Sequence, residues 1–162
     1  MGKIIMAVLA GLMIAATVCI AADNPGLSRA MAKATLFTGL TDTERDTLKS
    51  ATRLRQARAG ECIIKQGTKS GSRFIILDSP AEILVNGNHI VTLSGQSLVG
   101  EIEFLDTLPA SADVIVTQDT DLIEMNHTAL TDLMDKHPRM GYVLMRELAK
   151  IAAQRLRAGN SK

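Results

Sequence analysis

The sequence predicts a mainly β domain with flanking α-helices, the last of which closes the chain. Two observations predict this. Within residues 53–126, short apolar runs are separated by turn-forming residues about every 8–12 positions, which is typical of all-β sandwiches and barrels. After these runs, apolar residues recur at helical spacing behind a proline. We therefore expect one domain over residues 27–158, with about eight short strands.

Composition excludes several functional classes. The 162 residues carry 18 Lys and Arg against 17 Asp and Glu with no long basic run, which argues against a nucleic-acid partner. The chain has no Trp, one Tyr and three Phe, which argues against a platform for stacking bases. Two cysteines are too few for a disulfide scaffold or a four-thiolate zinc site. We expect no metal, because carboxylates clustered on a loop are more often solvated. We expect no catalytic residues, because no nucleophile stands in an activating context.

The first 22 residues form a separate segment. A positive start at Lys3 precedes an apolar run over residues 4–22, and the sequence Asp-Asn-Pro-Gly at residues 23–26 predicts a turn. This layout is typical of a signal peptide, and the alternative is an uncleaved membrane anchor formed by residues 4–22. In either case the domain is expected to be periplasmic or otherwise exported, and to contact the membrane only if the segment stays attached. Cys19 lies in this segment, and Cys62 is expected to be a small buried residue in a strand.

Local signals place the first helix and the strands. Thr41 and Glu44 have the spacing of a capping box, followed by Leu48 and Ala51 on one face. The dipeptide Asn86-Gly87 between two apolar runs predicts a type I′ hairpin. The apolar runs expected to form strands cover residues 62–64, 74–77, 81–85, 89–93, 113–117 and 121–125.

Two helices are expected after the last strand. Asn126 can cap the first, and Pro138 suits the first turn of the second. An apolar stripe on the final helix either packs against the β unit or forms the seam of a homodimer, and the spacing alone does not distinguish the two. Arg155 and Arg157 suit the negative end of the helix dipole. We expect His89, His127 and His137 to be surface or capping residues. The stripe consists of Met140, Leu144, Leu148, Ile151, Ala152 and Leu156.

Residues 36–156 resemble the cyclic nucleotide-binding domain family. The resemblance rests on Gly60-Glu61-Cys62-Ile63 followed by Gln66-Gly67, on Phe74-Ile75-Ile76-Leu77, and on the run from Leu93 to Gly100-Glu101. It implies a β-roll of the double-stranded β-helix or jelly-roll type with a C-terminal helix. It also implies a phosphate-binding cassette. In this family, backbone N–H groups at a short helical turn and one arginine hold the cyclic phosphate, while a glutamate accepts hydrogen bonds from the ribose.

The cassette of this chain departs from the family pattern. The matching positions, taken as candidate ligand-binding residues, are Gly100, Glu101, Ile102, Ala110, Ser111 and Ala112. Ala110 stands where the arginine is expected, and Glu103 and Asp113 add acidic groups nearby. A buried phosphate needs a charge partner and converging donors. The sequence therefore predicts that cyclic nucleotides do not bind in the usual way. We expect no cofactor, a cyclic nucleotide being disfavoured.

Three functions remain open at this point. The first is a non-catalytic sensory and regulatory module for an unidentified small molecule. The second is a structural or interaction module with a vestigial pocket, which contacts an envelope protein or a second copy through the last helix. The third is a genuine cyclic nucleotide receptor that replaces the arginine by Arg73 or the Ser111 hydroxyl. An open, lined cavity favours the first and a filled one favours the second.

Overall fold

The computed structural model describes residues 24–160. The expected signal peptide or anchor over residues 1–22 lies outside these residues. Within residues 24–160, no helix is both long enough and apolar enough to cross a membrane.

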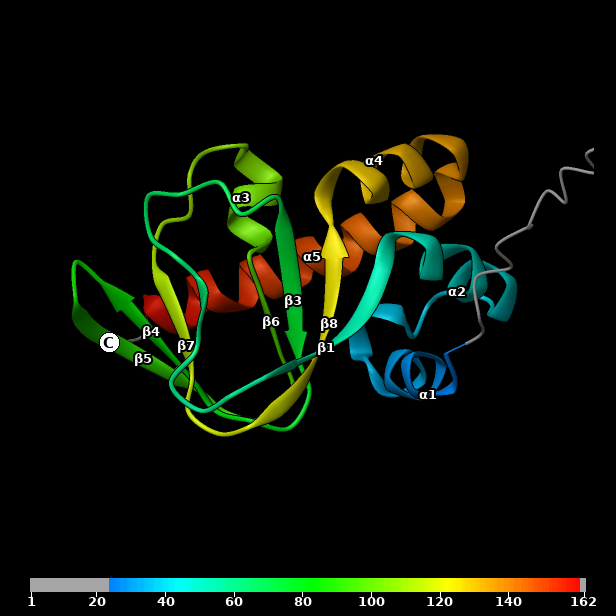
Figure 1. Cartoon of the computed structure of the whole chain (residues 1–162). Coiled ribbons are helices and arrows are strands. Elements are labelled where there is room, and N and C mark those ends of the chain that lie inside the picture. The colour runs from blue at the N-terminus through cyan, green and yellow to red at the C-terminus, as the bar shows by residue number, and fades with distance from the viewer. Residues whose placement is uncertain (1–23, 161–162) are drawn as a thin grey trace, which may run out of the picture.

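Two four-stranded antiparallel sheets form a β-roll, which confirms the predicted fold (Figure 1). Side chains from both sheets meet between them in one apolar core, which includes Ile64, Phe74, Val114 and Leu122. The first sheet has the order β1 (Thr52–Ala57), β8 (Thr120–Asn126), β3 (Ser72–Ile76) and β6 (Ser97–Val99). The second has the order β2 (Cys62–Ile64), β7 (Asp113–Val116), β4 (Ala81–Val85) and β5 (Asn88–Leu93).

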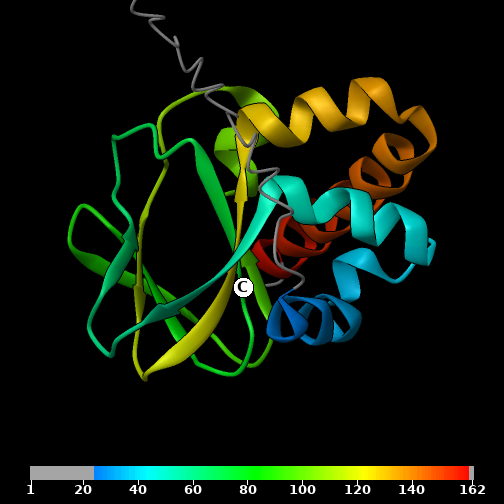
Figure 2. The ribbon, with the colours of Figure 1, turned by 45° about the vertical axis from the view of Figure 1, so that its right-hand side comes forward.

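Most helices gather on the outer side of the first sheet, where a second apolar core forms (Figure 2). Ile75, Ile123 and Met125 contribute to this core from the sheet. A separate short helix, α3 (Glu101–Asp106), follows β6 directly. The gathered elements are α1 (Pro25–Lys33), η1 (Thr35–Phe37), α2 (Asp42–Leu48), η2 (Lys49–Ala51), α4 (His127–Lys136) and α5 (Pro138–Gly159).

The helix caps and the hairpin predicted from local signals are confirmed. Thr41 and Glu44 form a reciprocal capping box at α2, in which each side chain accepts from the other residue's backbone N–H. Asn126 accepts a hydrogen bond from the Ala129 N–H and caps α4. Asn86 and Gly87 both have positive φ and connect β4 to β5, as a type I′ turn requires.

Three local expectations are wrong. Pro25 and Gly26 begin α1 instead of a turn, because Asn24 caps the helix and proline suits its first position. Cys62 is exposed, because it lies at the outward-facing start of β2 beside a register shift. The apolar runs expected to form strands also missed two strands, β1 and β6. In β1 charged residues alternate with Leu54, and β6 has only three residues.

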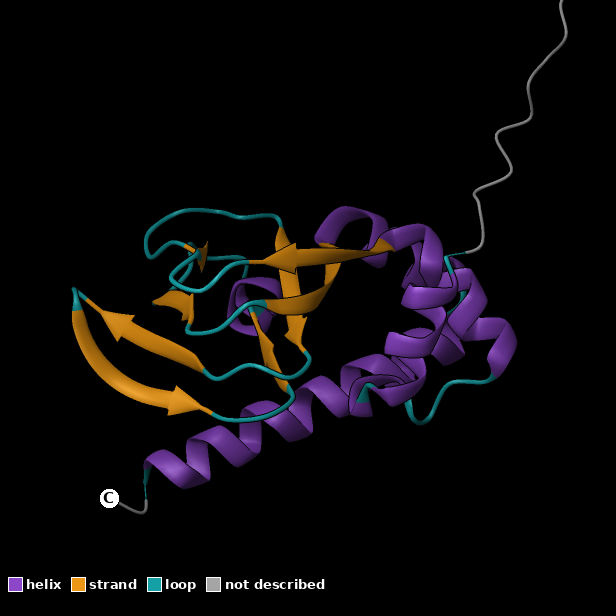
Figure 3. Ribbon diagram, turned by 60° about the horizontal axis from the view of Figure 1, so that its bottom comes forward, coloured by secondary structure: helices purple, strands orange, loops and turns teal. Residues whose placement is uncertain are grey.

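The final helix α5 runs along the whole length of the molecule, from the helical core to the second sheet (Figure 3). Met140, Leu144 and Leu148 in its first half are buried against the domain, which decides how that part of the stripe packs. Toward the C-terminus, Leu156 is 67% exposed. The homodimer through α5 stays a prediction. Only the residues of α5 that face away from the domain are available for it.

Candidate functional site

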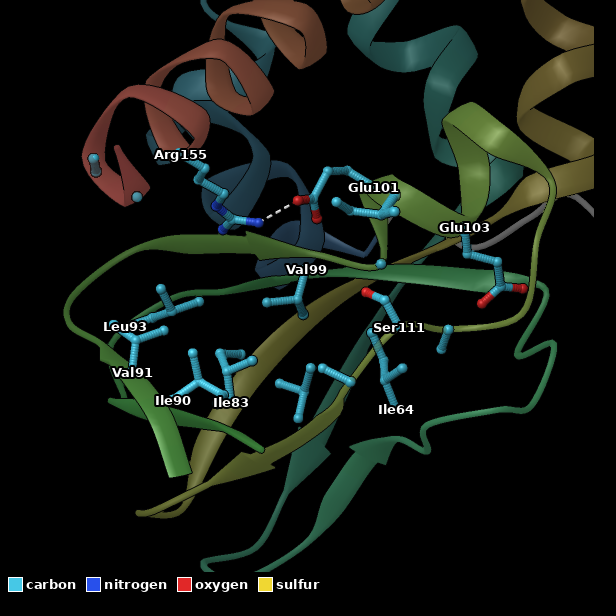
Figure 4. Close-up of a pocket in the computed structure, with 17 residues that line it drawn as sticks. Ile64, Ile83, Ile90, Val91, Leu93, Val99, Glu101, Glu103, Ser111 and Arg155 are labelled. Atoms are coloured by element: carbon cyan, nitrogen blue, oxygen red, sulfur yellow. Dashed lines mark hydrogen bonds and ion pairs between the residues drawn. The ribbon is translucent and has the colours of Figure 1, made fainter. Parts of the chain in front are cut away.

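A pocket of about 700 Å³ opens in the β-roll beside the end of α5 (Figure 4). Its walls come from both sheets, from α3 and from the last turns of α5. All six residues taken as cassette positions line it. The complete lining is Ile64, Ile83, Ile90, Val91, Leu93, Val99, Gly100, Glu101, Ile102, Glu103, Ala110, Ser111, Ala112, Val114, Arg155, Ala158 and Gly159.

The backbone turn that begins α3 requires glycine at position 100. Gly100 has φ +83°, and a Cβ atom there would lie 3.1 Å from the Ser72 carbonyl oxygen and the Arg73 Cα. Any side chain at this position would therefore be strained in its backbone and crowded by β3. This glycine lets the first turn of α3 lie close against the strand and directs Glu101 into the pocket.

Glu101 is bound by an arginine of α5. Its side chain is 2% exposed, and the Arg155 guanidinium donates to Glu101 Oε1 and also to the Leu98 carbonyl oxygen (Figure 4). The pair joins the start of α3, the end of β6 and the last turns of α5. Arg155 therefore does more than complement the helix dipole as expected, because its side chain reaches back into the roll.

The two other acidic residues of the cassette are engaged by groups from neighbouring loops. Glu103 lines it, but its carboxylate accepts hydrogen bonds from the Ser70 N–H and hydroxyl and from the Gly71 N–H. Asp113 pairs with Lys65 at 2.8 Å and accepts from the Gln66 N–H, which lowers the pKa of its carboxyl. Local donors thus engage both carboxylates, and the expectation that these acidic groups disfavour an anion stays a prediction.

Ala110 occupies the position expected for the arginine. Its N–H donates to the Thr68 carbonyl, and its own carbonyl accepts from the Gly67 N–H, so the backbone is fixed to the neighbouring loop. Its side chain offers only a methyl group. Among the lining residues, Arg155 is the one cation, and Glu101 already binds it.

Arg73 does not substitute for the missing arginine. It is fully buried on β3, is not among the pocket's lining residues, and stacks on Phe104 with its guanidinium carbon 3.5 Å from the ring centroid. None of its guanidinium nitrogens has a hydrogen-bond partner among the described residues. Burial lowers its pKa to about 9, against an opposing influence from Glu101.

His127 belongs to the same interior cluster, so the expectation of a plain surface or capping role is wrong for this histidine. Its ring meets Phe104 edge-on at 5.2 Å between centroids, and its Nδ1 lies 4.0 Å from Glu103 Oε1. Burial, followed by the charge of Arg73, lowers its pKa below the ordinary 6.5. His137 occupies the N-cap position of α5 without a capping hydrogen bond from its side chain, and His89 is exposed.

Sequence reasoning overlooked Arg155 as a pocket residue, although a signal was present. Arg155 follows Leu148 by seven positions and Ile151 by four, so it lies on the face of α5 that carries the apolar stripe. A charged residue on an apolar helix face indicates a buried partner. Within residues 24–160, no group of three or more His, Cys, Asp or Glu side chains could hold a metal ion.

Comparison with known proteins supplies a family for this geometry. The sequence profile of the cyclic nucleotide-binding domain matches residues 54–137. The Pycsar effector protein XpPycTIR of Xanthomonas perforans is 30% identical over 113 residues, which are 64% of this chain and 37% of the effector. The chain thus corresponds to little more than a third of that relative.

Two solved structures share the fold. A cyclic nucleotide-binding domain from Methylobacillus flagellatus superposes with a TM-score of 0.70 at 20% identity, over 82% of this chain and 77% of that one. The regulatory subunit of a cAMP-independent protein kinase A from Trypanosoma brucei, as a triple mutant bound to cAMP in its A site, superposes with a TM-score of 0.58. It is 21% identical, over 76% of this chain and 49% of that one.

Proposed function

The chain belongs to the cyclic nucleotide-binding domain family, and we propose that it is a non-catalytic, ligand-sensing regulatory module that does not hold cyclic nucleotides in the family's usual way. The observation that carries this proposal is that, among residues 24–160, the pocket lining offers no unpaired cation. Ala110 supplies a methyl group at the cassette turn, and Arg155 is engaged by Glu101.

The energetic consequence follows from the cost of burying an anion. A charge-assisted hydrogen bond contributes about 1.5–3 kcal/mol, so its loss weakens binding about ten- to hundredfold. A cyclic phosphate that recruited Arg155 instead would leave Glu101, which is 2% exposed, without its partner. A cyclic nucleotide is thus disfavoured whether it binds without a cation or takes Arg155 from Glu101.

The Trypanosoma brucei neighbour supports this reading of the cassette. Its cAMP-bound form carries three substitutions. Glutamate is replaced by alanine, threonine seven residues later by arginine, and the next residue, valine, by alanine. Glu103, Ala110 and Ser111 have the same spacing in this chain, with glutamate at the first position and no arginine at the second. We infer that the present cassette resembles the unsubstituted, cAMP-independent form.

The two alternatives account less well for the site. A vestigial, purely structural role predicts a filled roll, whereas the cavity is open and about 700 Å³ in volume. A genuine cyclic nucleotide receptor needs a substitute donor. Arg73 lies outside the pocket lining, and the Ser111 hydroxyl carries no charge.

Isothermal titration calorimetry of the purified full chain with cAMP and cGMP tests the proposal. We expect no saturable heat up to about 1 mM of either nucleotide, because no free cation compensates the phosphate. Micromolar binding of either would overturn the proposal. A cooperative thermal unfolding transition in the same buffer controls for folded protein.

We also propose an exported location, periplasmic or anchored by residues 4–22, on the strength of the apolar N-terminal run. The partner that receives the signal is then an envelope protein or another part of the same assembly. Mass spectrometry of the expressed protein tests the leader: loss of about 22 residues supports cleavage, and an intact mass in the membrane fraction supports the anchor. An intact mass in the cytosolic fraction would contradict both.

A homodimer through α5 is the second interaction we propose. Tyr142, Met145, Ala149, Ala152 and Leu156 repeat at alternating spacings of three and four, which is the spacing of a helix-to-helix seam. Tyr142 and Leu156 are 65% and 67% exposed. Light scattering after gel filtration should give a dimer mass that Leu156→Glu converts to a monomer. A monomeric parent chain would contradict the seam.

A further inference from the structure

We infer that the pocket takes an uncharged, predominantly apolar molecule that presents a hydroxyl group to Glu101. This inference rests on the proposed ligand-sensing function and names the chemical class of the ligand. It is drawn from the character of the walls and from the compensation of every charge in them.

The walls are aliphatic over most of their extent. Side chains such as Ile64, Ile83, Val91, Leu93 and Val99 line the pocket from both sheets (Figure 4). None of the chain's aromatic residues is among the lining residues. Each methylene group that such a surface removes from water strengthens binding about fourfold. A hydrocarbon skeleton therefore suits this cavity.

The charges in the walls exclude a charged end on the ligand. A carboxylate would compete with Glu101 for Arg155, and an ammonium would compete with Arg155 for Glu101. In both cases a group that is now paired would be left buried without a partner. A hydroxyl can donate to the Glu101 carboxylate, which accepts several hydrogen bonds, while the ion pair stays in place.

A nucleoside fits these walls less well. Its base edge carries several donors and acceptors, and each must find a partner once water is removed. The side chains of the lining offer the Ser111 hydroxyl, two engaged carboxylates and one engaged guanidinium, with aliphatic groups elsewhere. Most of the polar atoms of the base would face those aliphatic groups.

A fluorescence competition assay with the full chain tests the ligand class. The uncharged probe N-phenyl-1-naphthylamine should bind with saturable enhancement. The C10 alcohol 1-decanol should displace it at least tenfold more effectively than decanoate or decylammonium, and guanosine should not displace it. Equal displacement by all three head groups, preference for either charged one, or better displacement by guanosine would overturn the inference.

A pocket-filling variant with a matched control localises the binding. Ala112→Phe places a ring in the pocket and should weaken probe binding at least tenfold. Ala59→Phe adds the same ring at an exposed turn, outside both the pocket lining and the α5 seam, and should leave binding unchanged. Equal binding by both variants, each shown to be folded by its unfolding transition, would place the probe elsewhere and contradict the inference.

Glu101→Gln provides a charge-based readout in the same assay. This variant keeps the shape of the side chain but removes the charge that engages Arg155. The effectiveness of decanoate in displacing the probe should therefore rise at least tenfold relative to that of 1-decanol. An unchanged ratio would contradict the role given to the ion pair. Displacement of the probe by micromolar cAMP would instead overturn the proposed function, so the two failures are distinguishable.

Discussion

Helix α3 has a charged group at each of its two faces, and these groups differ in whether they have an ion-pair partner. On the pocket face, Glu101 and Arg155 come from separate elements and form an ion pair. On the interior face, Arg73 is buried and His127 is partly buried, and the Arg73 guanidinium stacks on the ring of Phe104. The cation of the pocket face is therefore ion-paired, whereas the guanidinium of the interior face has no hydrogen-bond partner among the described residues.

Removing the cation of the pocket face should have the largest effect on stability. Arg155→Ala leaves the Glu101 carboxylate buried and unpaired, which costs about 2–4 kcal/mol once the partial exposure of Arg155 is allowed for. Urea unfolding measures the loss. Gln154→Ala, at the neighbouring exposed position of the same helix, controls for the substitution. A loss as small as the control's would mean that Glu101 is not buried in solution.

Replacing the cation of the interior face should have the opposite sign. Arg73→Met keeps an extended side chain and removes a buried charge that lacks hydrogen bonds, so the free energy of unfolding should rise by about 1–3 kcal/mol. The gain is limited because the stacking on Phe104 is lost. Thermal unfolding of both proteins checks this. A destabilised variant would reveal a partner for the guanidinium and remove the contrast between the two faces.

The smallest of the three expected effects is a pH dependence of stability that arises from His127 on the interior face of α3. Burial and Arg73 hold the pKa of His127 below 6.5, so the unfolded chain takes up the proton first as the pH falls. The stabilising contribution is therefore complete above pH 6.5 and is lost below it, as the pH falls toward the folded-state pKa. Unfolding midpoints at several pH values should decline less for His127→Gln than for the parent. Parallel curves would contradict the assignment.

Sequence reasoning succeeded where the determining interactions are local. The capping box of Thr41 and Glu44 and the turn at Asn86-Gly87 involve residues within a few positions of one another. The family resemblance placed the cassette residues, and all six of them line the pocket.

The partners of the charged side chains in the site could not be predicted in the same way. Glu103 is engaged by a loop more than 30 residues away, and Arg155 reaches Glu101 across 54 residues. The direction of each side chain depends on the tertiary fold, and the pattern along the chain does not contain it. The apolar stripe of α5 did contain a hint, because Arg155 lies on its buried face.

The central claim is that a missing cation at the cassette turn, and not the shape of the roll, prevents cyclic nucleotide binding. Calorimetric titration of cAMP into the triple variant Glu103→Ala/Ala110→Arg/Ser111→Ala, and into Ala110→Arg alone as the simpler form, tests it most directly. We expect the arginine to strengthen cAMP binding about ten- to hundredfold over the parent chain. Folded variants that bind cAMP no better than the parent would contradict the claim.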